Sequence, residues 1–186
     1  LVNDISRIIV FSDISKREGP LSIEKEFTQS EKKDAILLYC VQLLSSGYTG
    51  DDIRELANNS IQTIFDRELV QVNILNTMAS YCPAFGMIGT LVGLVIMFEK
   101  MGADLSAIGI GMALALLTTL YGVLITHLIL KPSAEKLRQR HEIIQFRNNI
   151  IAEGICMIAD GKDSLTIQDN LNSYLDPSRR LNISEE

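Results

Sequence analysis

Residues 80–98 read SYCPAFGMIGTLVGLVIMF, and residues 105–130 read LSAIGIGMALALLTTLYGVLITHLIL. Neither segment contains a charged side chain, and only Glu99, Lys100 and Asp104 are charged between them. A helix of about 20 apolar residues crosses the roughly 30 Å hydrocarbon core of a bilayer, so each segment is long enough to span it. Because the connection is short, the sequence predicts a transmembrane helical hairpin with both flanking parts of the chain on one side.

Basic residues indicate which side this is. Five of them follow the second span closely: Lys131, Lys136, Arg138, Arg140 and Arg147. Lys and Arg accumulate on the cytoplasmic side of membrane proteins, so we expect both termini of this chain in the cytoplasm. The alternative, a buried hairpin in a soluble protein, would need a large soluble domain around it.

Composition excludes several classes of function. The 186 residues are 47% hydrophobic with a net charge of −6, and residues 1–68 carry 12 acidic and 8 basic side chains, which argues against nucleic-acid binding. Cys40, Cys82 and Cys156 are far apart and lack metal-ligand spacing, so we expect reduced, buried thiols and no metal site. The common nucleotide-binding, hydrolase and metalloprotease motifs are missing, so we expect no enzyme.

The apolar periodicity predicts an all-α protein. The expected helices cover residues 4–15, Pro20 to about Phe27, a segment capped by Ser30 and ended by Gly47, 51 to about 81, 133–159 and 165–175. Pro83 and Pro132 are expected to mark a kink or boundary at the ends of the hairpin. We therefore expect a cytoplasmic helical domain over residues 1–79, the hairpin over 80–131, and cytoplasmic C-terminal helices with a tail over 132–186.

Small residues share one face of each span. They are Gly86, Gly89, Thr90 and Gly93 in the first span, and Gly111, Ala115, Thr118, Thr119, Gly122 and Thr126 in the second. Small residues let helices pack closely in lipid. The threonines have two open interpretations, since they either bond their own helix backbone or line a path for an ion. The spans hold no Asp, Glu, Lys or Arg, so a conducted ion would need a carboxylate from elsewhere.

Three segments carry a resemblance to a known family. Residues 82–94, CPAFGMIGTLVGL, and residues 112–122, MALALLTTLYG, resemble the third and fourth transmembrane helices of the flagellar stator A subunit, the MotA/PomA family of the MotA/TolQ/ExbB superfamily. Residues 16–24, KREGPLSIE, resemble its cytoplasmic torque motif. The resemblance covers nearly the whole chain. It implies an inner-membrane stator subunit that couples the flow of Na⁺ or H⁺ to torque on the rotor.

The resemblance also implies partners. In this family, five A subunits form a ring around two B subunits, and each B subunit supplies a helix with an ion-binding Asp. The cytoplasmic domain of the A subunit pushes the rotor protein FliG. We therefore expect a pentameric homo-oligomer in contact with lipid and with a MotB-like or PomB-like B subunit. No cofactor is expected besides the transported ion.

Individual residues match functional positions of the family. Pro83 and Pro132 match two prolines that couple ion flow to motion. Lys16, where the family usually has Arg, and Glu24 match the charged pair that meets the rotor. Arg17 can substitute for that Arg, because Lys lacks the guanidinium fork.

Threonines suggest the identity of the ion. Thr90 and Thr119 match threonines of sodium-type subunits, and we include the neighbouring Thr118 in the expected ion pathway. A hydroxyl oxygen suits a hard cation, whereas a hopping proton needs no coordination cage.

The chain departs from the family at its start. The family's first two transmembrane helices have no counterpart here, and residues 1–15 resemble the segment after the second. The chain as given is therefore not expected to form a complete stator. Two alternatives are a proton-driven energy transducer of the cell envelope like TolQ or ExbB, and a membrane scaffold without ion flux.

Overall fold

The computed structural model describes residues 1–19, 21–23, 34–100, 102 and 105–180, and every regular element in that part of the chain is a helix, as predicted. The elements are α1 (Val2–Glu18), α2 (Ala35–Ser45), α3 (Gly50–Lys100), α4 (Leu105–Leu124), the π-helix η3 (Ile125–Leu130), α5 (Lys131–Ala159), α6 (Ser164–Asn172) and the 3-10 helix η4 (Pro177–Arg179). They divide into two compact units. The helical unit comprises Leu1–Asp66 with Glu142–Glu186, and the hairpin unit comprises Arg67–His141.

Helix boundaries in the helical unit follow ordinary capping chemistry. The Asp34 carboxylate accepts a hydrogen bond from the N–H of Leu37 at 3.4 Å, which caps the N-terminus of α2. The predicted cap Ser30 and most of the helix predicted after Pro20 lie outside the described residues. Gly47 and Gly161 follow α2 and α5 with φ of 81° and 69°, the left-handed conformation that glycine adopts without steric cost.

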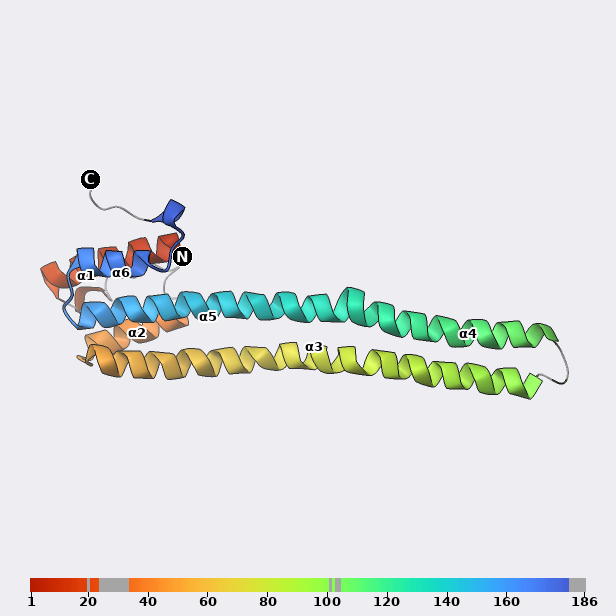
Figure 1. Cartoon of the computed structure of the whole chain (residues 1–186). Helices are drawn as coiled ribbons and strands as arrows, with labels where there is room; N and C mark the ends of the chain where they lie inside the picture. The colour runs from red at the N-terminus through yellow and green to blue at the C-terminus, as the bar shows by residue number, and fades with distance from the viewer. Residues whose placement is uncertain (20, 24–33, 101, 103–104, 181–186) are drawn as a thin grey trace. The chain divides into compact units, whose positions relative to one another are not determined.

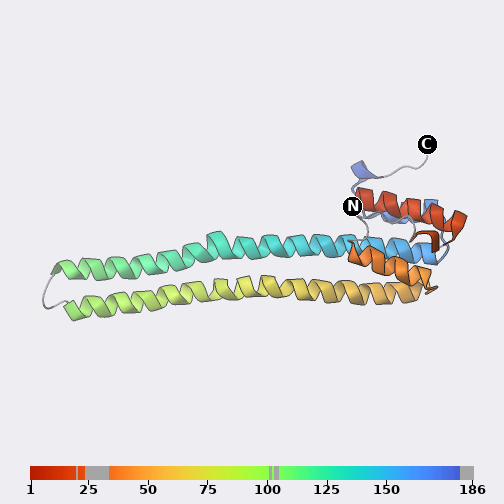
Figure 2. The same cartoon turned by 180° about the vertical axis from the view of Figure 1, so that it is seen from behind.

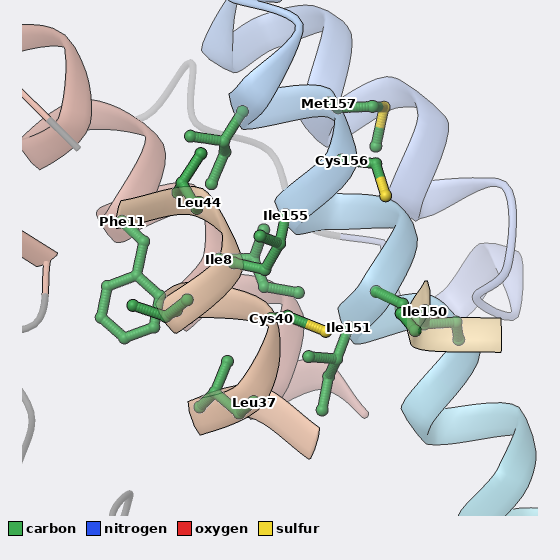
Figure 3. Close-up of a cluster of buried hydrophobic side chains, with 14 of the residues drawn as sticks. Ile8, Phe11, Leu37, Cys40, Leu44, Ile150, Ile151, Ile155, Cys156 and Met157 are labelled. Atoms are coloured by element: carbon green, nitrogen blue, oxygen red, sulfur yellow. The ribbon is translucent and has the colours of Figure 1, made fainter. Parts of the chain in front are cut away.

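Large apolar side chains form the core of the helical unit. Figure 3 shows side chains from α1, α2 and α5 converging in one cluster. Its members include Ile8, Phe11, Leu37, Leu44, Ile151 and Ile155, each no more than 5% exposed. Gly154 lets α1 approach α5 closely, because a β-carbon there would lie 2.7 Å from Cγ2 of Ile8. Burial of each large aliphatic side chain stabilises the fold by about 1.5–3 kcal/mol.

Two cysteines belong to this core. Cys40 of α2 and Cys156 of α5 are both fully buried. Burial raises the pKa of the Cys40 thiol to about 12 and that of Cys156 to about 11. Both side chains are therefore neutral thiols that pack as small apolar groups, as expected from the sequence, whereas Cys82, which was also expected to be buried, is only half-buried.

One arginine joins three elements of the helical unit. Arg147 of α5 donates to both carboxylate oxygens of Asp4 in α1, each at 2.7 Å, and to Oδ2 of Asp34 at 2.6 Å. The Arg147 guanidinium lowers the pKa of Asp4 by hydrogen bonding, and the two carboxylates raise the pKa of Arg147. The second carboxylate is the N-cap of α2, so one guanidinium holds α1, α2 and α5 together.

In the hairpin unit, α4 lies alongside α3 and runs antiparallel to it (Figures 1 and 2). The structure differs from the sequence prediction at Pro83. α3 continues through this proline to Lys100, so Pro83 does not end the helix. Pro132 is the second residue of α5, directly after η3, so the predicted boundary there coincides with a change from π-helical to α-helical backbone.

Apolar side chains cover the outside of the hairpin unit. The stretches of α3 and of the α4-to-α5 segment that are apolar and long enough to cross a membrane are only 11% and 17% buried. Phe85, Leu91, Ile110, Leu116 and Leu128 are each more than 60% exposed. A core helix of a soluble protein would bury such residues, so this surface is suited to lipid or to other apolar helices.

Candidate functional site

The contact between α3 and α4 is made by glycines. A β-carbon at Gly86 would lie 3.1 Å from the carbonyl oxygen of Thr118 and 3.2 Å from Cα of Thr119. One at Gly89 would lie 2.6 Å from Cβ of Thr118. Real β-carbons essentially never come as near to other atoms as 2.6 Å, and the distances at Gly86 are tighter than most real contacts. Glycine is therefore required at Gly89 for the two helices to approach this closely, and a side chain at Gly86 would force a small shift of the backbone that it meets.

The same contact continues along both helices. A β-carbon at Gly93 would lie 2.9 Å from the backbone nitrogen of Ala115, and one at Gly111 would lie 2.7 Å from Cβ of Met97. At the other end, a β-carbon at Gly122 would meet the carbonyl oxygen of Cys82 at 2.8 Å. The structure thus brings together all six residues that the sequence proposed for helix packing: Gly86, Gly89, Gly93, Gly111, Ala115 and Gly122.

The three threonines of the predicted ion pathway lie beside this contact and are half-buried. Their hydroxyls hydrogen-bond to the backbone of their own helices. Thr90 donates to the carbonyl of Met87 at 2.6 Å, while Thr118 and Thr119 both donate to that of Ala115, at 2.9 and 3.4 Å. A hydroxyl that donates its proton to a carbonyl keeps its oxygen lone pairs, which remain able to accept a hydrogen bond or bind a cation.

The described spans carry no formal charge of their own. Residues 69–98 and 108–130 include no Asp, Glu, Lys or Arg. Nowhere in the described chain do three His, Cys, Asp or Glu side chains come together as metal ligands would. These two spans therefore offer an ion neutral oxygen atoms but no carboxylate, and an ion between them would need a countercharge from another chain or segment.

The predicted rotor-facing residues belong to the helical unit. Lys16 lies in the last turn of α1 and pairs with Oδ1 of Asp163, the N-cap of α6, while Arg17 is exposed beside it. The Lys16 ammonium lowers the pKa of Asp163 by hydrogen bonding. Glu24, the predicted acidic partner, lies outside the described residues. Asp163 was missed from the sequence because it lies 147 positions after Lys16.

Thr126 is a further polar residue of the hairpin, which the sequence placed on the small-residue face but not among the three residues of the predicted ion pathway. It is 3% exposed, and its hydroxyl lies 3.1 Å from the carbonyl oxygen of Ala79 in α3 and 2.9 Å from that of Gly122. It is thus a buried side chain that hydrogen-bonds from the second span to the first. One feature of the sequence could have indicated such a hydrogen bond. Pro83 has no N–H, so the carbonyl of Ala79, four residues earlier in the helix, lacks its usual backbone donor and needs another.

Together these features define a class of protein: a multi-pass helical membrane protein whose spans pack through glycines and expose threonine oxygens. Comparison with known proteins narrows the class. The model of the MotA/TolQ/ExbB proton channel family matches residues 28–149. The chain belongs to this family, which confirms the resemblance seen in the sequence, and the family is one of channels rather than enzymes.

Relatives of known name support the same grouping. The chain is 33% identical over 176 residues to the chemotaxis protein PomA of Vibrio alginolyticus, covering 95% of this chain and 68% of the relative. It is 29% identical over 182 residues to motility protein A of Treponema pallidum, covering 98% and 69%.

Solved structures share the fold. The chain superposes on a chain of C. jejuni MotAB with a TM-score of 0.87 at 21% identity, covering 97% of this chain and 70% of that one. For the MotAB stator complex of Bacillus subtilis, the TM-score is 0.84 at 23% identity, with the same coverage. The all-helical fold class predicted from the sequence is therefore confirmed.

Proposed function

We propose that this chain is an ion-conducting stator subunit of a bacterial flagellar motor in the inner membrane. The observation that carries the proposal is the pair of glycine-packed spans, residues 69–98 and 108–130, which present threonine oxygens but no carboxylate. Membership of a proton channel family and similarity to relatives named for motility and chemotaxis support it. These names favour a stator over an envelope energiser of the TolQ or ExbB kind.

A B subunit would complete the ion site. Because the described spans, residues 69–98 and 108–130, contain no acidic side chain, we propose that the ion-binding carboxylate comes from a second chain, a MotB-like or PomB-like subunit. The related solved structures are complexes of MotA and MotB, which supports this partner. We further propose that five copies of the complete A subunit form a ring around it, with lipid against the exposed apolar side chains.

Within the hairpin, Thr90, Thr118 and Thr119 are the proposed ion-pathway residues. Each donates its hydroxyl proton to its own backbone and so leaves oxygen lone pairs for a partly dehydrated cation. This arrangement favours Na⁺, because H⁺, the ion in the family's description, needs no oxygen cage. Pro83 and Pro132 are the proposed coupling prolines, since they lie at the cytoplasmic ends of the proposed spans.

The helical unit would transmit the torque to the rotor. We propose a cytoplasmic domain over residues 1–79, the membrane hairpin over 80–131, and cytoplasmic helices over 132–186, with both termini of the chain in the cytoplasm. Lys16, Arg17 and Glu24 are the proposed contacts to the rotor protein FliG. Charged contacts at the rim of an interface mainly steer and orient a partner, so reversing Lys16 and Arg17 to Glu should reduce swimming without preventing assembly.

The ion proposal is tested in a motile strain that lacks its own stator and carries the full-length protein with its B subunit. Thr90→Ala and Thr119→Ala should each raise the Na⁺ concentration for half-maximal swimming speed about fivefold, the effect of losing about 1 kcal/mol of binding. Thr77→Ala is the matched control. Its hydroxyl also bonds its own helix, at 2.8 Å from the Asn73 carbonyl, but it lies about two and a half turns from Gly86, on the opposite face of α3.

Three results would contradict parts of this proposal. Swimming that is independent of Na⁺ and stops when the proton gradient collapses would identify H⁺ as the ion and leave the threonines a packing role. An equal effect of Thr77→Ala would show that the change is not specific to the pathway. If the unaltered protein is abundant and assembles with its B subunit but the cells do not swim, the stator function itself is overturned.

A further inference from the structure

A backbone carbonyl in α3 lacks its usual donor. In an α-helix, the N–H of residue 83 would bond the carbonyl of residue 79, but Pro83 has no N–H and lies inside α3. Ala79 is only 2% exposed, so water does not replace the missing donor easily. A buried polar group without a partner destabilises the folded protein. This position therefore needs a donor from elsewhere.

The side chain of Thr126 supplies that donor from the other helix. Its hydroxyl oxygen lies 3.1 Å from the carbonyl oxygen of Ala79, and both residues are buried. The same hydroxyl also lies 2.9 Å from the carbonyl oxygen of Gly122, four residues earlier in its own helix. A hydroxyl has one proton, so these two carbonyls share it. Thr126 thus has one acceptor on each helix.

The main chain of Thr126 takes part in a second irregularity of the hairpin, the π-helix η3. Its carbonyl accepts a hydrogen bond from the N–H of Lys131, a spacing of five residues that defines the π-helix η3. Lys131 directly precedes Pro132, which has no N–H either. Hence the side chain of Thr126 contacts the segment of α3 whose hydrogen bonding is disturbed by Pro83. The main-chain carbonyl of Thr126 contacts Lys131, the residue directly before Pro132.

We infer that Thr126 is a positioning residue that links these two proline-disturbed segments: its hydroxyl takes the place of the N–H that Pro83 lacks and fastens η3 to α3. Because the two carbonyls share one donor, a small shift between the helices can move the hydrogen bond from the Ala79 carbonyl to the Gly122 carbonyl, and the hydroxyl keeps an acceptor throughout. A role for this link in torque rests on the proposed function, whereas the hydrogen bond itself does not.

A double-mutant cycle tests the hydrogen bond in the complete, detergent-solubilised stator complex. Thr126→Val keeps the shape but removes the hydroxyl. It should raise the ratio of unfolded to folded protein in a denaturant titration about threefold, the typical effect of one hydrogen bond between membrane helices. Thr126→Ser keeps the donor and should restore most of the loss. In a Pro83→Ala background, where residue 83 regains an N–H, Thr126→Val should have little effect.

Equal effects of Thr126→Val in both backgrounds, or no rescue by Ser, would overturn the inference. Amide hydrogen exchange provides a second readout if Pro83→Ala fails to assemble. Residues 127–131 should exchange about threefold faster in Thr126→Val than in the wild type, while Thr77→Val, which alters an exposed hydroxyl of α3, should leave them unchanged. Unchanged exchange in Thr126→Val would contradict the fastening of η3.

Swimming separates the role in coupling from the role in structure. Thr126→Val should slow swimming at unchanged membrane abundance, and Thr126→Ser should swim nearly normally. Normal swimming of Thr126→Val would overturn the positioning role in coupling. If even the unaltered stator supports no swimming, the proposed function fails, yet the denaturant cycle still measures the hydrogen bond.

Discussion

The helical unit and the hairpin unit hold their helices together in opposite ways. In the helical unit, large side chains such as Ile8 and Ile155 fill the space between helices, and a charged group, Arg147, ties helix ends together. In the hairpin unit, the contact consists mainly of glycines, main chain and the β-carbons of residues such as Thr118 and Ala115, while many large side chains are exposed on the outside. Water drives the first arrangement through the hydrophobic effect. In lipid that force is absent between helices, so close packing has to replace it.

Removing a large side chain should therefore damage the helical unit most. Ile155 is fully buried in its core. Ile155→Ala should lower the free energy of unfolding by about 2–5 kcal/mol, because it leaves a cavity where methyl groups were. Circular dichroism of the solubilised protein during denaturation would measure this. A change at the exposed Ile143 to Ala is the control, and an equally large loss there would contradict the assignment of the core.

The charged link of the helical unit predicts a pH dependence. Arg147 lowers the pKa of Asp4, so this carboxylate stabilises the folded state above its unfolded pKa of about 3.8, and the contribution is lost as the pH falls through its lower folded value. Asp4→Asn should destabilise the unit at pH 7 by about 1.5–3 kcal/mol, the range for hydrogen bonds to charged groups. Denaturation at several pH values should show the difference from wild type shrinking below about pH 4. A difference that is independent of pH would contradict an ionic contribution.

In the hairpin unit, enlarging a residue should destabilise the protein more than truncating one, because the helices meet at glycines. Gly89→Val would place a β-carbon 2.6 Å from Cβ of Thr118 and should cost about 1–3 kcal/mol through overpacking. Gly109→Val is a matched control in α4, because nothing lies within 4 Å of the β-carbon that it would add. Denaturant titration of both variants in the same detergent would compare them. Equal losses would refute the glycine contact.

Features that depend on local spacing could be predicted from the sequence. The apolar periodicity gave the helices, and the spacing of Gly86, Gly89 and Gly93 placed these residues on one face, where the structure has them facing α4. The effect of Pro83 was predicted wrongly as far as a helix boundary is concerned. A proline inside a helix leaves one carbonyl without a donor, and here Thr126, 47 positions from Ala79, provides one. No local pattern in the sequence reports such a distant donor.

Long-range polar partners were missed for the same reason. Arg147 was counted only as one of the basic residues after the second span, yet it bonds Asp4 and Asp34, which lie 143 and 113 positions earlier. Lys16 was expected near Glu24, and its described partner is Asp163. Such pairs depend on how helices pack in three dimensions. Short-range rules of capping and charge spacing therefore do not identify them.

The glycine contact has a consequence for entropy. A β-carbon at Gly93 would lie 3.0 Å from the carbonyl oxygen of Gly111, and one at Gly111 would lie 3.0 Å from that of Gly93. In the glycines, a Cα hydrogen occupies that direction, so each residue points a weak Cα–H donor at the other's oxygen. This reciprocal pair fixes two helices without freezing a single side-chain rotamer. Its formation therefore loses no side-chain conformational entropy, unlike the packing of an isoleucine core.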